Sequence, residues 1–296
     1  MSADLPPQAP ATASTGTAAA QPLATLTTLT ALTTSTRWAL SWLSNWLINW
    51  QHIIHFSALM AVLALTPSSY APKHQTAIAR HIYLGTAPLL AWFTVLSALV
   101  SVVLIRIVVV TALSYGLSRY ALEMVVRVLV LELIPLTAAL FVALRATIPS
   151  GAALSDMRFR GEFDAMVARG EEPIHAEILP RVLAGIFAVL MLAAVSCAVA
   201  LVLAYLAVYG FTPWGLEGYA RTVGKVFHPA VALILLMKTV LFSLAVSMIP
   251  MVACVYDHQT HLSSASARTV DDMQGLVRMF SVILMIEMAS LIGNYY

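Results

Sequence analysis

The sequence predicts an all-α, polytopic membrane protein. Of its 296 residues, 60% are hydrophobic and 10% are charged, whereas soluble domains carry about 25% charged residues. Such a chain has too few charges to cover a surface that faces water. Several apolar runs reach the roughly 18–20 residues needed to cross the hydrocarbon core, and they lack the alternation of a transmembrane β-barrel.

The composition and motifs also limit which partners, bonds and ligands the chain can be expected to have. A net charge of +2 is too small to favour nucleic acid as a partner. Cys197 and Cys254 both lie inside apolar runs, which predicts packing rather than disulfide bonds. The sequence contains no GxxxxGK[ST] phosphate-binding loop, so any nucleotide must be bound by another subunit. We expect no cofactor.

Residues 1–36 predict a disordered tail. They are rich in Ala, Thr, Ser and Pro and contain one acidic and no basic residue. Such a segment buries too little apolar surface to offset the entropy lost on ordering. It lacks the charged start of a cleaved signal peptide and the arginines of a plastid transit peptide.

Residues 37–66 predict an amphipathic helix that lies in the membrane interface. Tryptophan favours the headgroup zone and recurs here at every fourth residue, and polar side chains recur on another face. The tryptophans are Trp38, Trp42, Trp46 and Trp50, and the polar residues are Ser41, Ser44, Asn45, Asn49 and His52. An ordinary first span that contains tryptophan is the alternative. Pro67 and Pro72 end the segment.

Five transmembrane helices are expected after this segment: Leu84–Leu113, about Leu122–Pro149, Val182–Tyr209, Pro229–Tyr256 and Leu276–Gly293. Lys and Arg in short loops favour the cytoplasmic side. With the N-terminus inside, eight such residues are cytoplasmic and four are outside: Arg37, Lys73, Arg80, Arg158, Arg160, Arg169, Arg181 and Arg268 against Arg119, Arg127, Arg221 and Lys225. The bias predicts a cytoplasmic N-terminus, an outer C-terminus and a cytoplasmic charged loop at 150–180.

Several ionisable side chains fall within or near the spans: Arg106, Glu123, Arg127, Glu132, Arg145, Lys238 and Glu287. A charge at bilayer depth costs at least about 2.5–3.5 kcal/mol, so each needs a partner or a water-filled cavity. Those near span ends can reach the interface. Glu132, Lys238 and Glu287 lie deeper, and a Lys238–Glu287 pair would satisfy two of the charges. The sequence leaves open whether that pair only locks the bundle or also lines a substrate path.

Two histidine clusters have the three- or four-residue spacing of metal ligands. His52 and His55 form one, and Asp257, His258 and His261 form the other. Neither has further ligands beside it in the sequence, so we expect interfacial or capping histidines and no metal.

A membrane-embedded enzyme is weakly supported, because no nucleophile–base pattern and no HExxH motif occur.

The long charged segment after the second span is the main candidate for contact with a soluble partner, although an ordinary solvated loop is the alternative. Residues 161–185 read GEFDAMVARGEEPIHAEILPRVLAG. This stretch closely resembles the EQIDALxxMGxDP element, followed by PRVLAG, of MlaE/YrbE-type permeases. These permeases are the membrane subunits of ABC lipid transporters that work with MCE proteins.

The resemblance continues in order and spacing over about residues 80–293. Upstream, the family's ELGP and LTALL motifs, followed by an Arg, resemble the stretch from Glu132 to Leu140 with Arg145 after it. Downstream, the family's IKSxxFG motif resembles the stretch from Met237 to Ser243, and the acidic residue of the last span falls at Glu287. The family also has an interfacial helix before five spans, as expected here.

The resemblance implies a permease domain over residues 80–296 and a coupling helix within 159–173 that docks on a cytoplasmic ABC ATPase. Its residues are Glu162, Phe163, Asp164, Met166, Gly170 and Pro173. Apolar anchors with a polar rim suit a groove in a partner, and Phe163 and Met166 would be the anchors.

The resemblance further implies phospholipid or a similar lipid as substrate, with Glu132, Arg145, Lys238 and Glu287 on the path or as intramembrane charges. A periplasmic MCE-domain protein, often a small STAS-domain protein, and a second permease copy in a homodimer or heterodimer are the implied partners, in a bacterial inner membrane.

The chain departs from the family pattern in its second span. Leu131 stands where the family has an Arg, and Ile134 stands where it has a Gly. The glycine-rich stretches after span two and before span five are reduced to TIPSGAALSDM and SSASARTVDDM. Close approach between helices depends on such small residues. These departures favour the alternative of a non-transporting membrane scaffold that retains the permease fold. The retained Glu132, Lys238 and Glu287 and the retained coupling element oppose that alternative.

Overall fold

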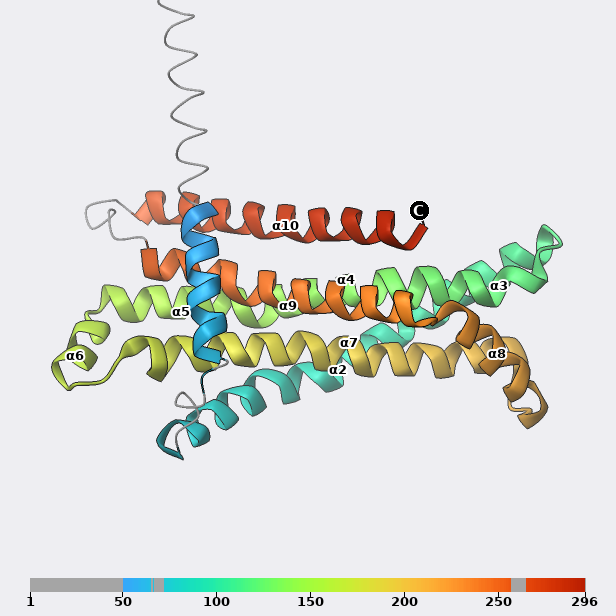
Figure 1. Cartoon of the computed structure of the whole chain (residues 1–296), viewed down its shortest axis with the longest axis horizontal. Coiled ribbons are helices and arrows are strands. Elements are labelled where there is room, and N and C mark those ends of the chain that lie inside the picture. Colours follow the sequence, from blue (N-terminus) through green and yellow to red (C-terminus); the bar gives the residue numbers. More distant parts are fainter. Residues whose placement is uncertain (1–49, 65, 67–71, 257–264, 296) are drawn as a thin grey trace, which may run out of the picture. The chain divides into compact units, whose positions relative to one another are not determined.

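The computed structural model describes residues 50–64, 66, 72–256 and 265–295 (Figure 1). The chain divides into residues 1–51 and residues 52–296, and the architecture below is that of the second unit. The predicted tail, residues 37–49 of the predicted interfacial helix and the Asp257–His258–His261 cluster lie outside the described residues. The described residues are helical apart from short turns, which confirms the all-α prediction.

Five helical segments are long and apolar enough to cross a membrane: Ile78–Ser114, Tyr120–Phe159, Ile174–Tyr209, Pro229–Val252 and Gly275–Asn294. A shorter apolar helix, Trp50–Ala64, precedes them. Its residues Ile53, Phe56 and Met60 are buried and follow the three- to four-residue period of one helix face. The five spans and the shorter N-terminal helix match the prediction, whereas the position of that helix in the membrane interface stays a prediction.

The first three spans are longer than the sequence suggested, and the third begins at Ile174 rather than at Val182. Helix α2 covers Pro72–Ser114, and a nearly continuous rod follows it, made of α3 Ser118–Val125, η2 Val126–Leu133, α4 Ile134–Val142, η3 Ala143–Thr147 and α5 Ile148–Phe159. We expected this span to end at Pro149 and a loop to begin at residue 150. Pro149 instead lies inside the helical rod, directly after η3, and the helix continues to Phe159.

Three π-helical turns, η2, η3 and η4 (Ile174–Ile178), interrupt the second and third spans. Each ends two residues before a proline: Pro135, Pro149 and Pro180. A proline inside a helix has no N–H to donate, and its ring presses on the carbonyl four residues earlier. Widening the helix before the proline relieves that contact, and such turns often lie at functional sites.

The remaining elements are α6 Glu162–Ala168, α7 Leu179–Tyr209, η5 Pro213–Gly215, α8 Leu216–Val226, α9 Pro229–Tyr256 and α10 Ala265–Tyr295. Helix α7 packs along α2, α4 and α9, and α10 packs along α9 (Figure 1). The short helix α6 joins the second and third spans at one end of the bundle, and α8 lies at the other end. Large apolar side chains of the spans, such as Leu99 and Val103, are exposed, as expected for surfaces that face lipid.

Candidate functional site

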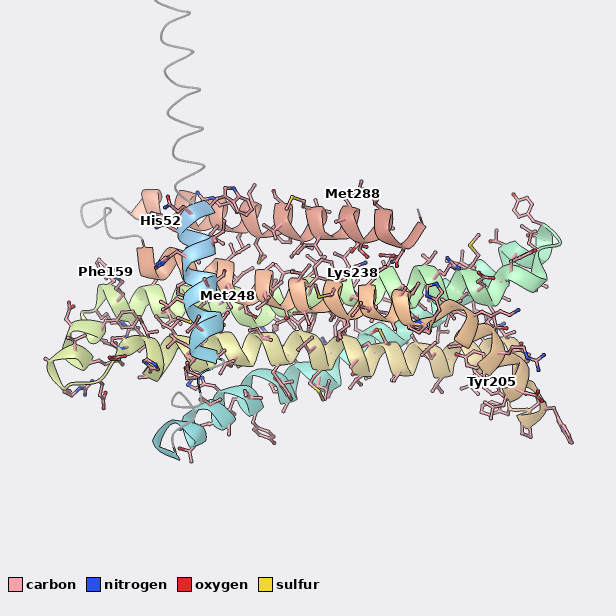
Figure 2. All side chains as sticks on the ribbon, in the orientation of Figure 1. His52, Phe159, Tyr205, Lys238, Met248 and Met288 are labelled. Atoms are coloured by element: carbon pink, nitrogen blue, oxygen red, sulfur yellow. The ribbon has the colours of Figure 1, made fainter. Side chains whose placement is uncertain are left out.

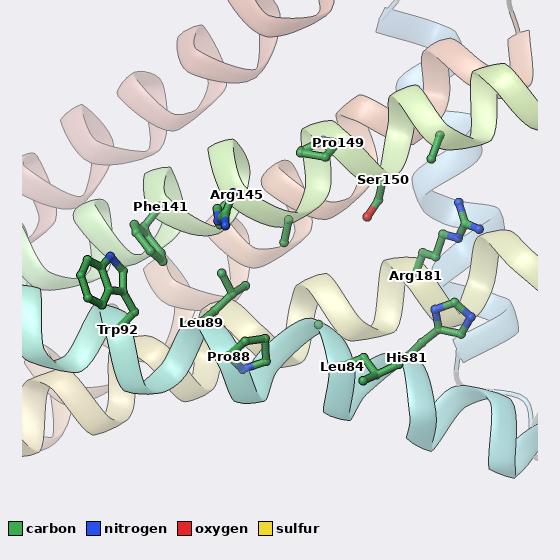
Figure 3. A pocket seen from close by; sticks show the side chains of 13 residues that line it. His81, Leu84, Pro88, Leu89, Trp92, Phe141, Arg145, Pro149, Ser150 and Arg181 are labelled. Carbon is green, nitrogen blue, oxygen red and sulfur yellow. The ribbon is translucent and has the colours of Figure 1, made fainter.

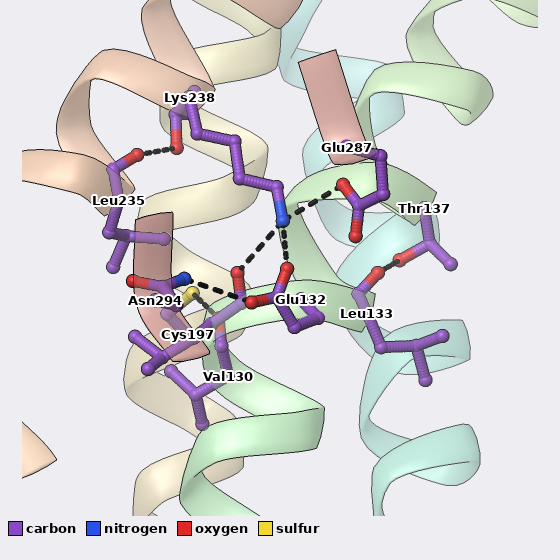
Figure 4. Close-up of polar contacts among 11 residues, drawn as sticks. Val130, Glu132, Leu133, Thr137, Cys197, Leu235, Lys238, Glu287 and Asn294 are labelled. Carbon is purple, nitrogen blue, oxygen red and sulfur yellow. Dashed lines mark hydrogen bonds and ion pairs between the residues drawn. The ribbon is translucent and has the colours of Figure 1, made fainter. Parts of the chain in front are cut away.

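A buried cluster of charged side chains joins three of the five spans. Lys238 of α9 is 2% exposed, and its Nζ atom lies 2.8 Å from Oε2 of Glu287 on α10. The same ammonium donates a hydrogen bond to Oε2 of Glu132 on η2 (Figure 4). The predicted contact between Lys238 and Glu287 is therefore confirmed, and Glu132 adds a second carboxylate. We call these three residues the charge triad.

Proline explains one further bond of the triad. Pro135 has no N–H to offer the carbonyl of Leu131, which lies four residues before it. That carbonyl accepts a hydrogen bond from Nζ of Lys238 at 3.3 Å. A backbone acceptor that lacks its usual helical donor thus becomes part of the ammonium's coordination, which lowers the cost of burying the charge.

Two more side chains complete the surroundings. Asn294, near the end of α10, donates from Nδ2 to Oε1 of Glu132 at 3.0 Å. The ring centroid of Phe242 lies 5.7 Å from Nζ of Lys238, within the range of a cation–π contact. Sequence reasoning missed Asn294 and the Leu131 carbonyl. The signal for the carbonyl was present, because the proline that frees it is visible in the sequence.

The triad holds two carboxylates and one ammonium, a formal charge of −1 when both carboxylates are ionised. Oε2 of Glu287 is buried and pairs with the ammonium of Lys238 at 2.8 Å. The contact is an ion pair, because two opposite charges at this short separation attract each other strongly.

Arg145 does not join the triad, although the family resemblance grouped it with these three residues as a path or intramembrane charge. It lies on η3, 13 residues after Glu132, which is about 20 Å along a helix. Arg145 lines a cavity of about 870 Å³ between α2, the α4–α5 rod and α7 (Figure 3). The three charges predicted to lie deep therefore form one cluster, and Arg145 lies at a separate place in the fold.

The predicted coupling segment forms a short helix between two tight turns. Gly161 and Gly170 flank α6 with φ angles of +73° and +76°, a conformation that L side chains rarely adopt. Glu162 lies in the first turn of α6 and pairs with Arg160 at 3.6 Å. Pro173 is half-buried and precedes η4, which leads into the third span.

The apolar side chains that the coupling segment exposes are not the two that the sequence led us to expect as anchors. Phe163 packs against the protein's own apolar core, and Met166 is half-buried. The apolar side chains that this segment exposes are Phe159 and Val167, at 69% and 63%. Asp164 is also exposed. Figure 2 shows Phe159 at the α6 end of the bundle and Lys238 well inside it.

Comparison with known protein families matches residues 78–292 to the family described as Permease MlaE. The chain belongs to the MlaE permease family. The matched region contains all five spans, the charge triad and α6. A search of curated proteins returned no match. Membership of a permease family, together with five helices long and apolar enough to cross a membrane, makes the chain a multi-pass membrane protein and the membrane subunit of a transporter.

Proposed function

We propose that this protein is the permease subunit of an ABC transporter that moves phospholipid or a related lipid between the bacterial inner membrane and a periplasmic MCE-domain protein. ATP would be hydrolysed by a separate cytoplasmic subunit. The observation that carries the proposal is the MlaE family match over residues 78–292, which includes a short helix with two acidic residues between spans two and three. The N-terminus would be cytoplasmic and the C-terminus periplasmic.

The exposed face of α6 supports a contact with the ATPase. Phe159 and Val167 offer apolar area, and the Asp164 carboxylate is exposed on the same segment at the water-facing end of two spans. A small apolar patch with a charged rim is the usual composition of a docking surface. Phe163 would then act inside the permease, fixing α6 to the bundle rather than entering a groove of the partner.

The charge triad would couple movement of the spans to movement of lipid. It connects the second, fourth and fifth spans through one ammonium. A relative shift of any of these helices must break or exchange an ion pair in a low-dielectric region, so the bundle has discrete rather than continuous arrangements. We propose that closure of the ATPases on ATP shifts this balance and opens a lipid path in a permease dimer.

Reconstitution tests this proposal. The full chain would be placed in vesicles with the ABC ATPase and the MCE protein encoded beside its gene, and a small STAS-domain protein where one is present. Transfer of fluorescent phospholipid to or from the MCE protein would be followed with ATP and with a non-hydrolysable analogue. ATP-dependent transfer supports the proposal. ATP hydrolysis by a stable complex without any transfer contradicts it.

A non-transporting scaffold is the second candidate, and one observation favours it. Lys238 is nearly inaccessible, and its charge is satisfied by groups of the same chain, so the triad needs no lipid headgroup for stability. A scaffold would hold its partners equally well when the triad is replaced by apolar side chains. Co-purification of an intact but inactive complex from both wild type and triad variants would support this second function.

A further inference from the structure

The cavity beside Arg145 has the composition of a binding site for one end of an anionic lipid. Its volume of about 870 Å³ lies within the about 300–1,000 Å³ typical of ligand pockets. Thirteen residues line it, and none of them is acidic. Arg145, Arg181 and His81 supply its basic groups, and apolar or aromatic side chains form most of the rest.

Two basic side chains lie at one end of the cavity and two aromatic side chains at the other. Figure 3 shows Trp92 and Phe141 at one end, His81 and Arg181 at the other, and Arg145 between them. This is the polarity profile of an amphiphile: a charged head at one end and hydrocarbon at the other. A water-soluble anion would need only the basic end.

Arg145 is the group that lacks a partner. Among the described residues no ion pair or hydrogen bond of its guanidinium occurs, although the side chain belongs to a membrane span. Arg181 differs, because it pairs with Glu177 at 2.7 Å and donates to the Met157 sulfur at 3.5 Å. A guanidinium has five donors, so both arginines retain N–H groups for a ligand.

The depth of the cavity matches the structure of a bilayer leaflet. Lys238 lies close to the middle of the fourth span, which places its partner Glu132 near the bilayer centre. Phe141 and Arg145 follow Glu132 by 9 and 13 residues, or about 14 and 20 Å along the helix. The hydrocarbon core extends about 15 Å from its midplane. Phe141 therefore lies at the depth of the upper acyl chains, and Arg145 lies at the depth of the phosphates.

We propose that this cavity binds the phosphate and upper acyl chains of an anionic lipid from the leaflet next to α6, with Arg145 as the phosphate contact. An arginine on a convex surface would touch any passing lipid. A cavity walled by three helices retains one, and its basic end selects a net negative headgroup over a zwitterionic one. The inference rests on the proposed lipid permease, for which it names a headgroup class and an entry site in one leaflet.

The test measures binding by the full chain without any ATPase, so its failure is distinct from a failure of coupling or transport. The purified protein in nanodiscs of phosphatidylcholine and phosphatidylglycerol would be released into detergent, and retained lipid would be counted by native mass spectrometry. We expect one retained phosphatidylglycerol. Arg145→Gln should lower its apparent affinity about tenfold or more, the loss expected for a hydrogen bond between charged groups. Arg145→Lys should restore part of it, because the charge remains without the planar fork.

Two further variants separate the site from general effects. Arg106→Gln is the matched control, because Arg106 is an exposed arginine of a span and does not line the cavity. It should leave phosphatidylglycerol retention unchanged. Ala153→Phe fills the cavity from α5 and keeps every charge, so it should lower retention as Arg145→Gln does. Equal retention by wild type, Arg145→Gln and Ala153→Phe would overturn the proposal.

A fluorescence measurement locates the bound lipid independently of its count. Trp92 lines the apolar end of the cavity, so phosphatidylglycerol with bromine atoms high on its acyl chains should quench it. The quenched component should vanish in Trp92→Phe and weaken in Arg145→Gln. Displacement of the lipid by millimolar inorganic phosphate would show that the basic end is a free-anion site and would overturn the lipid assignment. Loss of quenching on dimerisation would show that a second copy covers the cavity, which would overturn it as well.

Discussion

Replacing Lys238 by methionine should destabilise the permease much more than replacing Glu287 by glutamine. Lys238→Met leaves the carboxylates of Glu132 and Glu287 buried together without their shared ammonium. Breaking a buried ion pair by removing one partner costs about 3–5 kcal/mol, because an uncompensated charge remains. Glu287→Gln instead leaves one ammonium with one carboxylate, so we expect a loss nearer to about 0.5–1.5 kcal/mol, the net worth of a hydrogen bond.

The measurement is the free energy of unfolding of the full chain in mixed micelles with increasing sodium dodecyl sulfate, followed by circular dichroism. The double variant Lys238→Met/Glu287→Gln should recover part of the loss, and adding Glu132→Gln should recover more, because each step removes a buried charge that lacks a partner. We expect a coupling energy of about 1–3 kcal/mol between Lys238 and Glu287. Lys225→Met, which removes an exposed ammonium on α8, is the matched control and should change stability little.

Two results would refute this reasoning. If the losses of the two single variants add within about 0.5 kcal/mol in the double variant, the charges act independently. If Lys238→Met costs no more than Glu287→Gln, the ammonium does not balance two carboxylates. Either result would mean that the side chains face a hydrated lipid path in the working protein.

Three further predictions test other parts of the molecule. Asp164→Lys should abolish co-purification of the ATPase. It should leave the thermal stability of the permease unchanged, since the side chain is exposed. A normal complex with unchanged lipid-stimulated turnover would reject the coupling assignment. Cysteines placed at Thr30 and Tyr70 flank the predicted interfacial helix at residues 37–66. If that helix lies in the interface, both cysteines should react only with reagent on the cytoplasmic side. Labelling of the two from opposite sides would mean a sixth span. Gly151→Ala should lower stability by about 1–3 kcal/mol, because its Cβ would lie 2.9 Å from the Pro250 carbonyl oxygen. Gly224→Ala, with open space around its Cβ, should be neutral or slightly stabilising by the same unfolding measurement.

The spans were predictable because their signal is local. A run of apolar residues that is long enough to cross the bilayer needs no knowledge of its neighbours. The limits of the spans were less accurate, since Pro149 resembles a helix end in the sequence but lies inside the helical rod. Proline is compatible with both situations, and only the packing of the following turn decides between them.

The site was partly predictable for a different reason. Depth within a span identified Glu132, Lys238 and Glu287 as charges that need partners, and the contact between Lys238 and Glu287 followed from requiring charge balance. The contact of Lys238 with Glu132 joins residues 106 positions apart. Which helices touch is not encoded in the periodicity of either one, so that contact and the separate location of Arg145 required the fold.

The second span links the proposed parts of the mechanism physically. One nearly continuous rod carries Glu132 of the triad, then Arg145 of the cavity, and ends beside α6. Two of its turns are π-helical and precede prolines, so the rod has defined positions where its hydrogen bonding is already altered and can change at low cost. A push on α6 would therefore be taken up at η3 and η2 rather than spread evenly along the helix. These are the two turns that hold Arg145 and Glu132, so movement of α6 would reach the lipid cavity first and the triad second.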